Sequence, residues 1–433
     1  MANQEAVKTF LERSRTVPLN VDVRPVHRNV FPWVVRHTHR FRRLSVWASQ
    51  EFDPFASLTK PAPLLERLDI TCSDDLRPLI LFDDQAPRLR ELKIFASNLW
   101  FKNQPGNLTS LYLTLYDGTR PHSEFPPFFD MLHRCPALEE MFLWWNMCDV
   151  VSTELTQPHT VPLYNLRKLR LHSFCIPNVK YLLHSFDFMA DGIAIHLSDV
   201  DLESEGEHFI SRIQTVFPNN NPRQPSLFSS TKFELISHSQ PPGIILHAIG
   251  PRFSIRIDTH LDDYHPPNQM NFTPHDVFSS AKELWIRGPV PFVAELNGSG
   301  HFPALEKLVF DGRGSSLAGK IRRALSPDGS GNLPSPLLSA IDYYGDDEWE
   351  VDEIILLARS RYSVGHQLKM LRVPSSFVLL IFDVGGCVQD VGSLDIPSEA
   401  VHMYSMDLPD HCFAKGHEWW ESWQPELTNT EVF

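Results

Sequence analysis

Seven short stretches of the chain repeat one pattern of apolar residues, and this repetition constrains the fold more than any other feature. In each stretch an apolar residue is followed, three and five positions later, by two more. The last three positions alternate apolar, polar and apolar, which is the period of a half-buried strand. The stretches begin at Leu65, Leu89, Leu108, Leu138, Leu166, Ala281 and Leu305, with outlying copies at Phe41 and Leu368.

The spacing of these stretches is typical of leucine-rich repeats. From Leu65 to Leu166 successive copies begin 24, 19, 30 and 28 residues apart, and leucine-rich repeats have periods of about 20–29 residues. Several copies follow a proline, which ends a preceding helix and favours an extended chain. One repeat cannot bury its own apolar face, so neighbours must stack. The sequence therefore predicts an α/β fold, a leucine-rich-repeat-like curved solenoid of short parallel strands and short helices, although seven unrelated strands of an ordinary α/β domain remain the alternative.

The repeats define three regions of the chain. Residues 1–40 are expected to form an N-terminal cap of helix and strand, and residues 41–373 the irregular solenoid. The polar, proline-rich stretch 218–226 is the candidate break within it. Residues 374–433 are expected to form a C-terminal capping region and tail, because the end of a stack must be covered.

Helical patterns fall between the predicted strands. Apolar residues at helical spacing predict helices over 178–188, 205–217 and 317–325. A further helix is expected to open at the acidic residues 346–350 and to end near Arg361, because acidic residues suit the start of a helix and basic ones its end.

Composition narrows the classes of partner. The chain has 433 residues and a net charge of −14, which argues against nucleic acid or an anionic membrane surface as partner. Residues 1–50 are the exception, with nine Lys and Arg against three Asp and Glu. The six cysteines form no C-x-x-C pair and the N-terminus has no apolar signal region. We therefore expect an intracellular protein, cytoplasmic or nuclear, with reduced thiols.

Motifs for catalysis or cofactor binding are weak. The stretch Gly312-Arg-Gly314-Ser-Ser-Leu317 has leucine where a dinucleotide-binding loop needs its third glycine. The densest group of metal-ligand types lies at 260–265, where proline neighbours favour a solvated loop. We expect no catalytic residue, no metal, no cofactor and no enzymatic activity, with an uncharacterised hydrolase as the least favoured alternative.

The residues between the buried leucines point out of the sheet. Aromatic and arginine side chains dominate the energetics of protein interfaces, and large exposed aromatics mark a binding surface. The candidate protein-binding residues on the concave face are Phe95, Tyr112, Phe142, Trp144, Arg170, His172, Trp285 and Arg287. The alternative is that another segment packs over this face and buries them.

Three features carry a resemblance to a known family. They are the segment Phe10-Leu-Glu-Arg-Ser-Arg15 with Val17–Val23 after it, the stretch from His37 to Leu44, and Ala/Cys-Pro-x-Leu-x-x-Leu copies at Ala62, Ala86 and Cys135. Together these features resemble a divergent family of fungal F-box proteins with leucine-rich-like repeats. The resemblance implies a repeat fold that recognises the substrate protein of a cullin-RING ubiquitin ligase. In that family an F-box precedes the matching segment and docks onto a Skp adaptor.

The chain departs from the family at its start, since Met1 lies nine residues before Phe10 and no F-box fits. We therefore expect no docking of a Skp-type adaptor by this chain, whether the F-box is truncated or lost. The expected function is recognition of a protein client by the concave face, as in the substrate-receptor part of a ubiquitin-ligase subunit. A free-standing scaffold or decoy that binds the same clients is the alternative.

Overall fold

The computed structural model shows a mixed α/β fold. It describes residues 4–49, 51–72, 80–96, 102–115, 125–147, 160–188, 192–200, 216–217, 230–239, 242–250, 253–260, 277–287, 302–311, 317–329, 331–345, 347–381 and 386–394. Within these ranges sixteen strands form a large, mostly parallel sheet, accompanied by short helices. The chain divides into two compact units, which are described separately. Unit 1 comprises residues 1–190 and 198–201, and unit 2 comprises residues 191–197 and 202–433.

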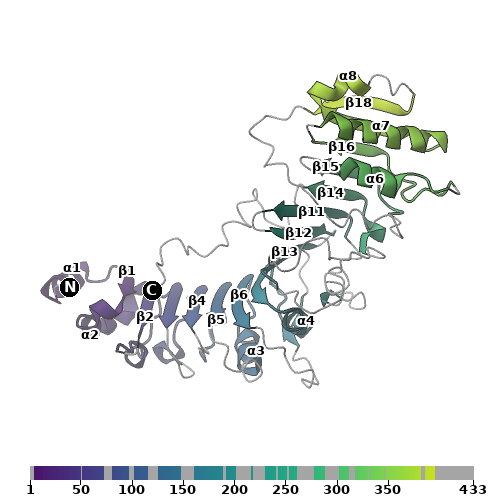
Figure 1. Ribbon diagram of the computed structural model, residues 1–433. Helices are drawn as coiled ribbons and strands as arrows, with labels where there is room; N and C mark the ends of the chain where they lie inside the picture. Colours follow the sequence, from purple (N-terminus) through teal and green to yellow (C-terminus); the bar gives the residue numbers. More distant parts are fainter. Residues whose placement is uncertain are drawn as a thin grey trace. The chain divides into compact units, whose positions relative to one another are not determined.

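Unit 1 is a row of parallel strands in chain order (Figure 1). They are β1 (Leu19–Val23), β2 (Phe41–Ala48), β3 (Arg67–Cys72), β4 (Glu91–Ala96), β5 (Ser110–Leu115), β6 (Glu140–Met147) and β8 (Lys168–Phe174). Each pairs in parallel with the next. Two short strands, β7 (Val161–Pro162) and β9 (Phe186–Asp187), pair with each other outside this row. The helical segments of unit 1 are α1 (Gln4–Ser14), η1 (Pro25–His27), α2 (Phe31–Val34), η2 (Val35–Arg40), η3 (Phe55–Ser57), η4 (Phe82–Asp84), α3 (Phe125–His133) and α4 (Ile176–Ser185).

The apolar positions of the repeats stack in register and form the core of unit 1. Leu68 pairs with Leu92, which pairs with Leu111, and the row continues through Met141 to Leu169. None of these side chains is measurably exposed. Burial of one such side chain contributes about 1.5–3 kcal/mol, so the rows of leucines hold neighbouring repeats together.

A tight turn closes each repeat before its strand. The Leu65 N–H donates to the Ala62 carbonyl at 3.1 Å, and Leu89 donates to Ala86 at the same distance. The bond recurs at Leu108, Leu138, Leu166, Ala281 and Leu305. The first apolar residue of each repeat therefore closes the turn into its strand.

The N-terminal residues are continuous with the repeats. The strand expected within residues 1–40 is β1, and it pairs with β2. Arg40, at the end of η2, is buried and donates to the carbonyl oxygens of Leu11 at 3.2 Å and Val17 at 3.1 Å. It thereby supplies donors to the end of α1, where carbonyl groups lack helical partners. The sheet of unit 1 therefore begins before residue 41.

Unit 2 contains both parallel and antiparallel strands. Its strand order is β10 (Ile193–Ser198), β13 (Phe253–His260), β12 (Pro242–Ile249), β11 (Lys232–Ser239), β14 (Glu283–Arg287), β15 (Lys307–Asp311), β16 (Ala340–Tyr343), β17 (Leu368–Pro374) and β18 (Val388–Leu394). The prediction of parallel strands is wrong for the pairings of β12, which is antiparallel to both β11 and β13, whereas β11 pairs in parallel with β14. Only residues 240–241 separate β11 from β12, and so short a connection permits only antiparallel pairing.

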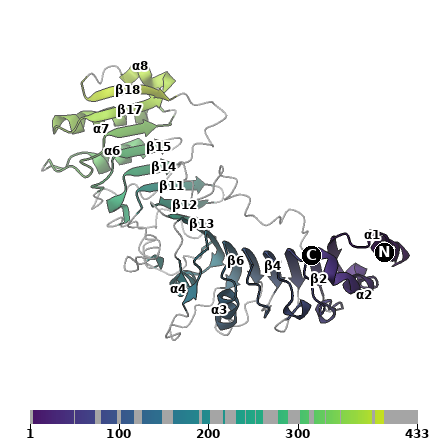
Figure 2. The same ribbon diagram turned by 180° about the vertical axis from the view of Figure 1, so that it is seen from behind.

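The helices of unit 2 are η8 (Val277–Ser280), α6 (Leu317–Leu325), α7 (Glu348–Ser363), η10 (Ser375–Phe377) and α8 (Val378–Ile381). Of these, α6 and α7 lie side by side against the strands (Figures 1 and 2). The helix predicted over 317–325 is confirmed, and so is the acidic start of the next helix. Asp347 caps α7 by accepting a hydrogen bond from the Trp349 N–H at 2.9 Å. The apolar side of α7 is buried and includes Val351, Ile354 and Leu357.

Several predictions lie outside the described residues. They are most of the 205–217 helix, the 218–226 break, the acidic and histidine cluster from 261 onward, and residues 395–433. The described part of the capping region includes β18, which pairs in parallel with β17 and adds another strand to the sheet. No helix among the described residues is long and apolar enough to cross a membrane. Within the described ranges, Cys72, Cys135, Cys175 and Cys387 take part in no disulfide.

Candidate protein-binding site

Outward side chains of unit 1 form three rows across the strands from β2 to β8, because each strand pairs in register with the next. Row 1 consists of Arg43, Arg67, Glu91, Ser110, Glu140 and Lys168. Row 2 consists of Ser45, Asp69, Lys93, Tyr112, Phe142 and Arg170. Row 3 consists of Trp47, Thr71, Phe95, Thr114, Trp144 and His172. Six of the eight predicted binding residues lie in rows 2 and 3.

Row 1 is held by ion pairs between neighbouring strands. Arg67 Nη1 lies 3.4 Å from Glu91 Oε1, and Lys168 Nζ lies 2.6 Å from Glu140 Oε1. Arg67 also contacts Asp69 at 3.0 Å. Burial raises the pKa of Asp69, although the positive charge of Arg67 opposes the shift. These contacts hold the long side chains of row 1 in place.

In row 2, two neighbouring aromatic rings lie between two cations. Lys93 Nζ lies 4.6 Å from the centre of the Tyr112 ring, and Tyr112 lies 6.3 Å from the Phe142 ring. The Arg170 guanidinium lies 5.4 Å from the other side of Phe142. Burial, with the nearby carboxylates of Glu140 and Glu91, raises the pKa of Tyr112 to about 12. The phenol therefore keeps its proton and remains a hydrogen-bond donor at neutral pH.

Rows 2 and 3 meet at Ser198, the last residue of β10, which belongs to unit 1. Arg170 Nε donates to Ser198 Oγ at 3.2 Å, and His172 Nδ1 lies 2.9 Å from the same oxygen. The Trp144 ring meets the His172 ring edge to face, with 4.9 Å between their centres. Ser198 therefore fixes the two basic side chains of β8 relative to the aromatic side chain of β6.

The predicted site residues differ in how far their side chains are buried. Phe95, Tyr112, Trp144 and His172 are half-buried on the outward face. Phe142 is only 3% exposed and Arg170 only 8%, so the expectation that they present open surface is wrong. The reason lies in the row itself, because Phe142 is covered on both sides by Tyr112 and Arg170.

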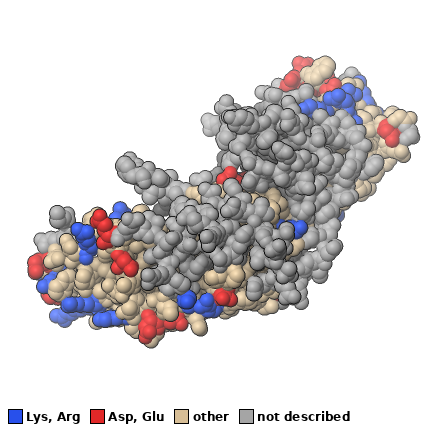
Figure 3. Space-filling model, turned by 60° about the horizontal axis from the view of Figure 1, so that its bottom comes forward, with Lys and Arg blue, Asp and Glu red and all other residues tan. Residues whose placement is uncertain are grey.

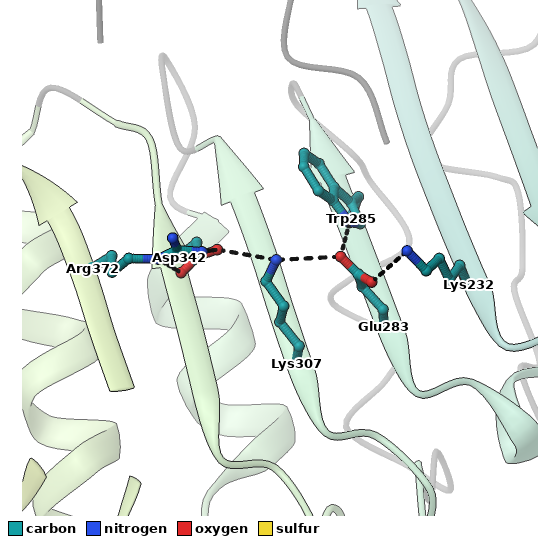
Figure 4. Close-up of polar contacts among 6 residues, drawn as sticks. All are labelled: Lys232, Glu283, Trp285, Lys307, Asp342 and Arg372. Carbon is teal, nitrogen blue, oxygen red and sulfur yellow. Dashed lines mark hydrogen bonds and ion pairs between the residues drawn. The ribbon is translucent and has the colours of Figure 1, made fainter. Parts of the chain in front are cut away.

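In unit 2 the outward face carries a chain of ion pairs across five strands, drawn in Figure 4. Lys232 lies 3.1 Å from Glu283, and Lys307 lies 3.3 Å from both Glu283 and Asp342. Arg372 Nε then donates to Asp342 at 2.7 Å. Asp342 is 1% exposed, so two cations compensate a buried carboxylate.

Trp285 contacts two members of this chain of ion pairs, Glu283 and Lys307. Its indole N–H donates to Glu283 Oε1 at 2.8 Å, and Lys307 lies 5.5 Å from its ring (Figure 4). Burial tends to raise the pKa of Glu283, but hydrogen bonds from Trp285 and Lys232 outweigh it and lower that pKa. Trp285 is half-buried, while the side chain of Arg287 lies outside the described residues. The carboxylate therefore stays ionised and holds the indole in place.

Sequence reasoning missed part of this site. Trp47 extends row 3, and its signal was the outlying repeat at Phe41, whose outward residues follow the same spacing. Asp342 lies in a further copy of the repeat, Leu338-x-x-Ile341-x-Tyr343, which also follows a proline. Ser198 carries no repeat signal, because it lies on a strand that departs from the pattern.

The chemistry of these faces suits binding. They offer aromatic rings, cations and hydrogen-bond donors that are already held by neighbours. Within the described ranges no group of three His, Cys, Asp or Glu could hold a metal ion. Among the described residues on the face seen in Figure 3, Lys and Arg side chains occur beside Asp and Glu side chains.

Comparison with known proteins adds no family assignment. No protein-family model matches the chain, and no curated protein matches it.

Proposed function

We propose that this chain is a leucine-rich-repeat-like solenoid whose outward strand face recognises a protein client inside the cell. The observation that carries the proposal is the arrangement of rows 2 and 3. Tyr112, Trp144 and His172 lie on neighbouring strands, half-buried and braced by specific contacts. Aromatic and cationic side chains of this kind supply most of the binding energy in protein interfaces.

Repeated packing supports the solenoid. The same turn, the same buried leucine and the same in-register pairing recur from one repeat to the next. In such architectures each repeat contacts its neighbours, and binding surfaces extend across successive strands. The resemblance to F-box proteins supports a role as the client-binding part of a ubiquitin-ligase subunit. A free-standing scaffold or decoy would use the same face.

Affinity capture with point variants tests the proposal. The wild-type chain, Trp144→Ala and Trp285→Ala are used as bait in cell extract, and bound proteins are quantified by mass spectrometry. Trp349→Ala is the matched control, because Trp349 is 65% exposed and lies on helix α7 and not on a strand. We expect a set of clients whose recovery falls about tenfold with Trp144→Ala, as for an interface hot spot, and is unchanged with Trp349→Ala.

Equal recovery from Trp144→Ala, Trp285→Ala and wild type would contradict the proposal. Circular dichroism and the midpoint of thermal unfolding show whether each variant is folded, so that lost binding is not mistaken for lost structure. The Skp adaptor is quantified in the same samples. Its recovery with clients favours the ligase role, while clients without the adaptor favour the scaffold.

A further inference from the structure

A serine or threonine precedes a proline at three positions of the chain, Thr273, Ser326 and Ser335. Ser335 is fully buried, with 0% of its surface exposed, and Thr273 lies outside the described residues. Ser326 is half-buried and is the first residue after α6. Of the two described serines that precede a proline, Ser326 is therefore the one that reaches solvent.

Pro327 places Ser326 at the boundary between a helix and a surface loop. Proline has no N–H and disfavours a helical conformation at the residue before it, and α6 accordingly ends at Leu325. Asp328 and Gly329, which follow the proline, are exposed. Exposed loops are the parts of a fold that a modifying enzyme reaches most easily, so the dipeptide Ser326-Pro327 is accessible where Ser335-Pro336 is not.

The hydroxyl of Ser326 contacts the neighbouring helix α7. Its Oγ lies 3.3 Å from the Oγ of Ser360. Ser360 donates its own proton to the Leu357 carbonyl at 2.9 Å, and a hydroxyl has one proton to donate. Ser326 is therefore the donor in this contact between α6 and α7, and a group that replaces its proton removes the hydrogen bond.

Arg322 makes a second contact between the same two helices. Its Nε donates to the carboxylate of Glu353 on α7, and Glu353 is 7% exposed, so this cation compensates a buried charge. The Ser326 N–H donates to the Arg322 carbonyl at 2.9 Å, which places the two residues one helical turn apart. Side chains at this spacing are neighbours. An anionic group on Ser326 therefore competes with Glu353 for Arg322.

The other charges near Ser326 are of both signs. The end of α6 carries partial negative charge on its last carbonyl groups, and Asp328 adds a carboxylate two residues later. Arg323 and Arg359 are exposed cations nearby, and Arg323 Nε donates to the Gly319 carbonyl at 3.3 Å. Repulsion of a new anion is offset only as arginines turn toward it, and for Arg322 that movement breaks the ion pair between α6 and α7.

We propose that Ser326 is a phosphorylation site for a proline-directed serine kinase and that the phosphate loosens α6 from α7. Ser326 Oγ attacks the γ-phosphorus of ATP, and the Oγ–P bond forms as the bond from that phosphorus to the bridging β-oxygen breaks. ADP leaves, and the hydroxyl proton passes to a base of the kinase. The phosphate carries about −1.5 to −2 charges at pH 7, removes the donor to Ser360 and attracts Arg322. This inference is independent of the proposed client binding.

Kinase treatment of the full chain tests the site. The wild-type chain, Ser326→Ala and Ser335→Ala are incubated with MgATP and a purified proline-directed serine kinase, and phosphorylated residues are mapped by tandem mass spectrometry. Ser335 is the matched control within the chain, because it precedes a proline but is buried. We expect phosphate on Ser326 in the wild type and in Ser335→Ala, and none on Ser335 in the wild type or in Ser326→Ala. Absence of phosphate on Ser326, or equal modification of Ser335, would overturn the assignment.

Hydrogen exchange tests the consequence for the two helices. Peptides of α6 and α7 should exchange about tenfold faster in the phosphorylated chain than in the untreated one, because a hydrogen bond and an ion pair between them are lost. Peptides of β4 and β5 in unit 1 should be unchanged. Ser326→Ala, compared with and without ATP, controls for effects of the kinase itself and should show no difference. Unchanged exchange of α6 and α7 after complete phosphorylation of Ser326 would overturn the loosening.

Discussion

Glu350 links two helices of unit 2 through a buried carboxylate. It lies on α7 and is 1% exposed. Its Oε1 accepts a hydrogen bond at 2.9 Å from the N–H of Leu317, the first residue of α6, and its Oε2 accepts one at 3.1 Å from the Tyr343 hydroxyl. Asp347, at the start of α7, is the neighbouring acid. A protonation change at Glu350 therefore affects the contact between α6, α7 and β16.

Burial is the main cause of the shifted pKa of the Glu350 carboxyl group. It raises the pKa of Glu350 from 4.5 to about 7, with a further rise from the Asp347 charge, although hydrogen bonds from Tyr343, Ala318 and Leu317 oppose the shift. Each pKa unit corresponds to about 1.36 kcal/mol, so the shift amounts to about 3 kcal/mol. Between pH 4.5 and 7 the folded state binds a proton that the unfolded state has released. The free energy of unfolding therefore falls as pH rises through this window.

The substitution Glu350→Gln removes the titration while keeping an oxygen to accept from Leu317. Its new amide can donate to Tyr343, whose hydroxyl lies 3.4 Å from the Asp347 carbonyl and can donate there. We expect the variant to exceed wild type in stability by about 1–3 kcal/mol at pH 8, and to approach it near pH 4.5. Urea unfolding at several pH values measures the difference, and hydrogen exchange of α6 and α7 peptides assigns it to this contact.

Glu348→Gln is the matched control, because Glu348 lies two residues earlier on α7 and is exposed. Its unfolding curve should keep the pH dependence of wild type. The reasoning is refuted if Glu350→Gln also keeps that dependence, or if the variant is less stable than wild type at pH 8.

Three further changes test the fold and its charged contacts. Phe142→Ala should lower the free energy of unfolding by about 3–5 kcal/mol, because removal of a ring buried between Tyr112 and Arg170 leaves a cavity. Urea unfolding measures this loss, and a loss below about 1 kcal/mol would show that the ring is not part of the core. Asp342→Asn should lower the free energy of unfolding by about 1–3 kcal/mol, because two half-exposed cations lose their shared carboxylate. A midpoint of thermal unfolding equal to that of wild type would contradict a stabilising role of these ion pairs. Arg40→Ala should lower the free energy of unfolding by about 1–3 kcal/mol. It should also speed hydrogen exchange in α1, because the end of that helix then lacks the donors of Arg40. Unchanged exchange in α1 would show that the contact is dispensable.

Repeat spacing predicts the strands that carry a leucine at each turn, because burial and register depend on the same few positions. β3, β4, β5, β6 and β8 all follow from it. β12 does not follow from repeat spacing, because Pro242–Ile249 is a nearly continuous apolar run without the repeat pattern. Its place in the sheet is determined by pairing with β11 on one side and β13 on the other. Its position in the sheet depends on contacts that no local pattern encodes.

The outward direction of the candidate residues could be predicted from alternation, but their exposure could not. Phe142 points outward as expected and is nevertheless buried, because its neighbours on adjacent strands are Tyr112 and Arg170. Exposure depends on which side chains are brought together across strands, and this is a property of the register. Ser198 shows the same limit, since its partners Arg170 and His172 lie 28 and 26 residues earlier in the chain.

The antiparallel strands of unit 2 also bear on the order in which that unit assembles. Residues 240–241 and 250–252 are the only connections within β11, β12 and β13, so these strands meet through short loops. Hairpins of this kind form in about 1–10 μs, whereas each parallel pair must first close a longer loop at a greater entropic cost. The three strands are therefore placed to nucleate unit 2 and to offer β14 a preformed edge on which the later repeats add. Pulse-labelled hydrogen exchange during refolding should show β12 protected before β16, and the reverse order would assign nucleation to the repeats.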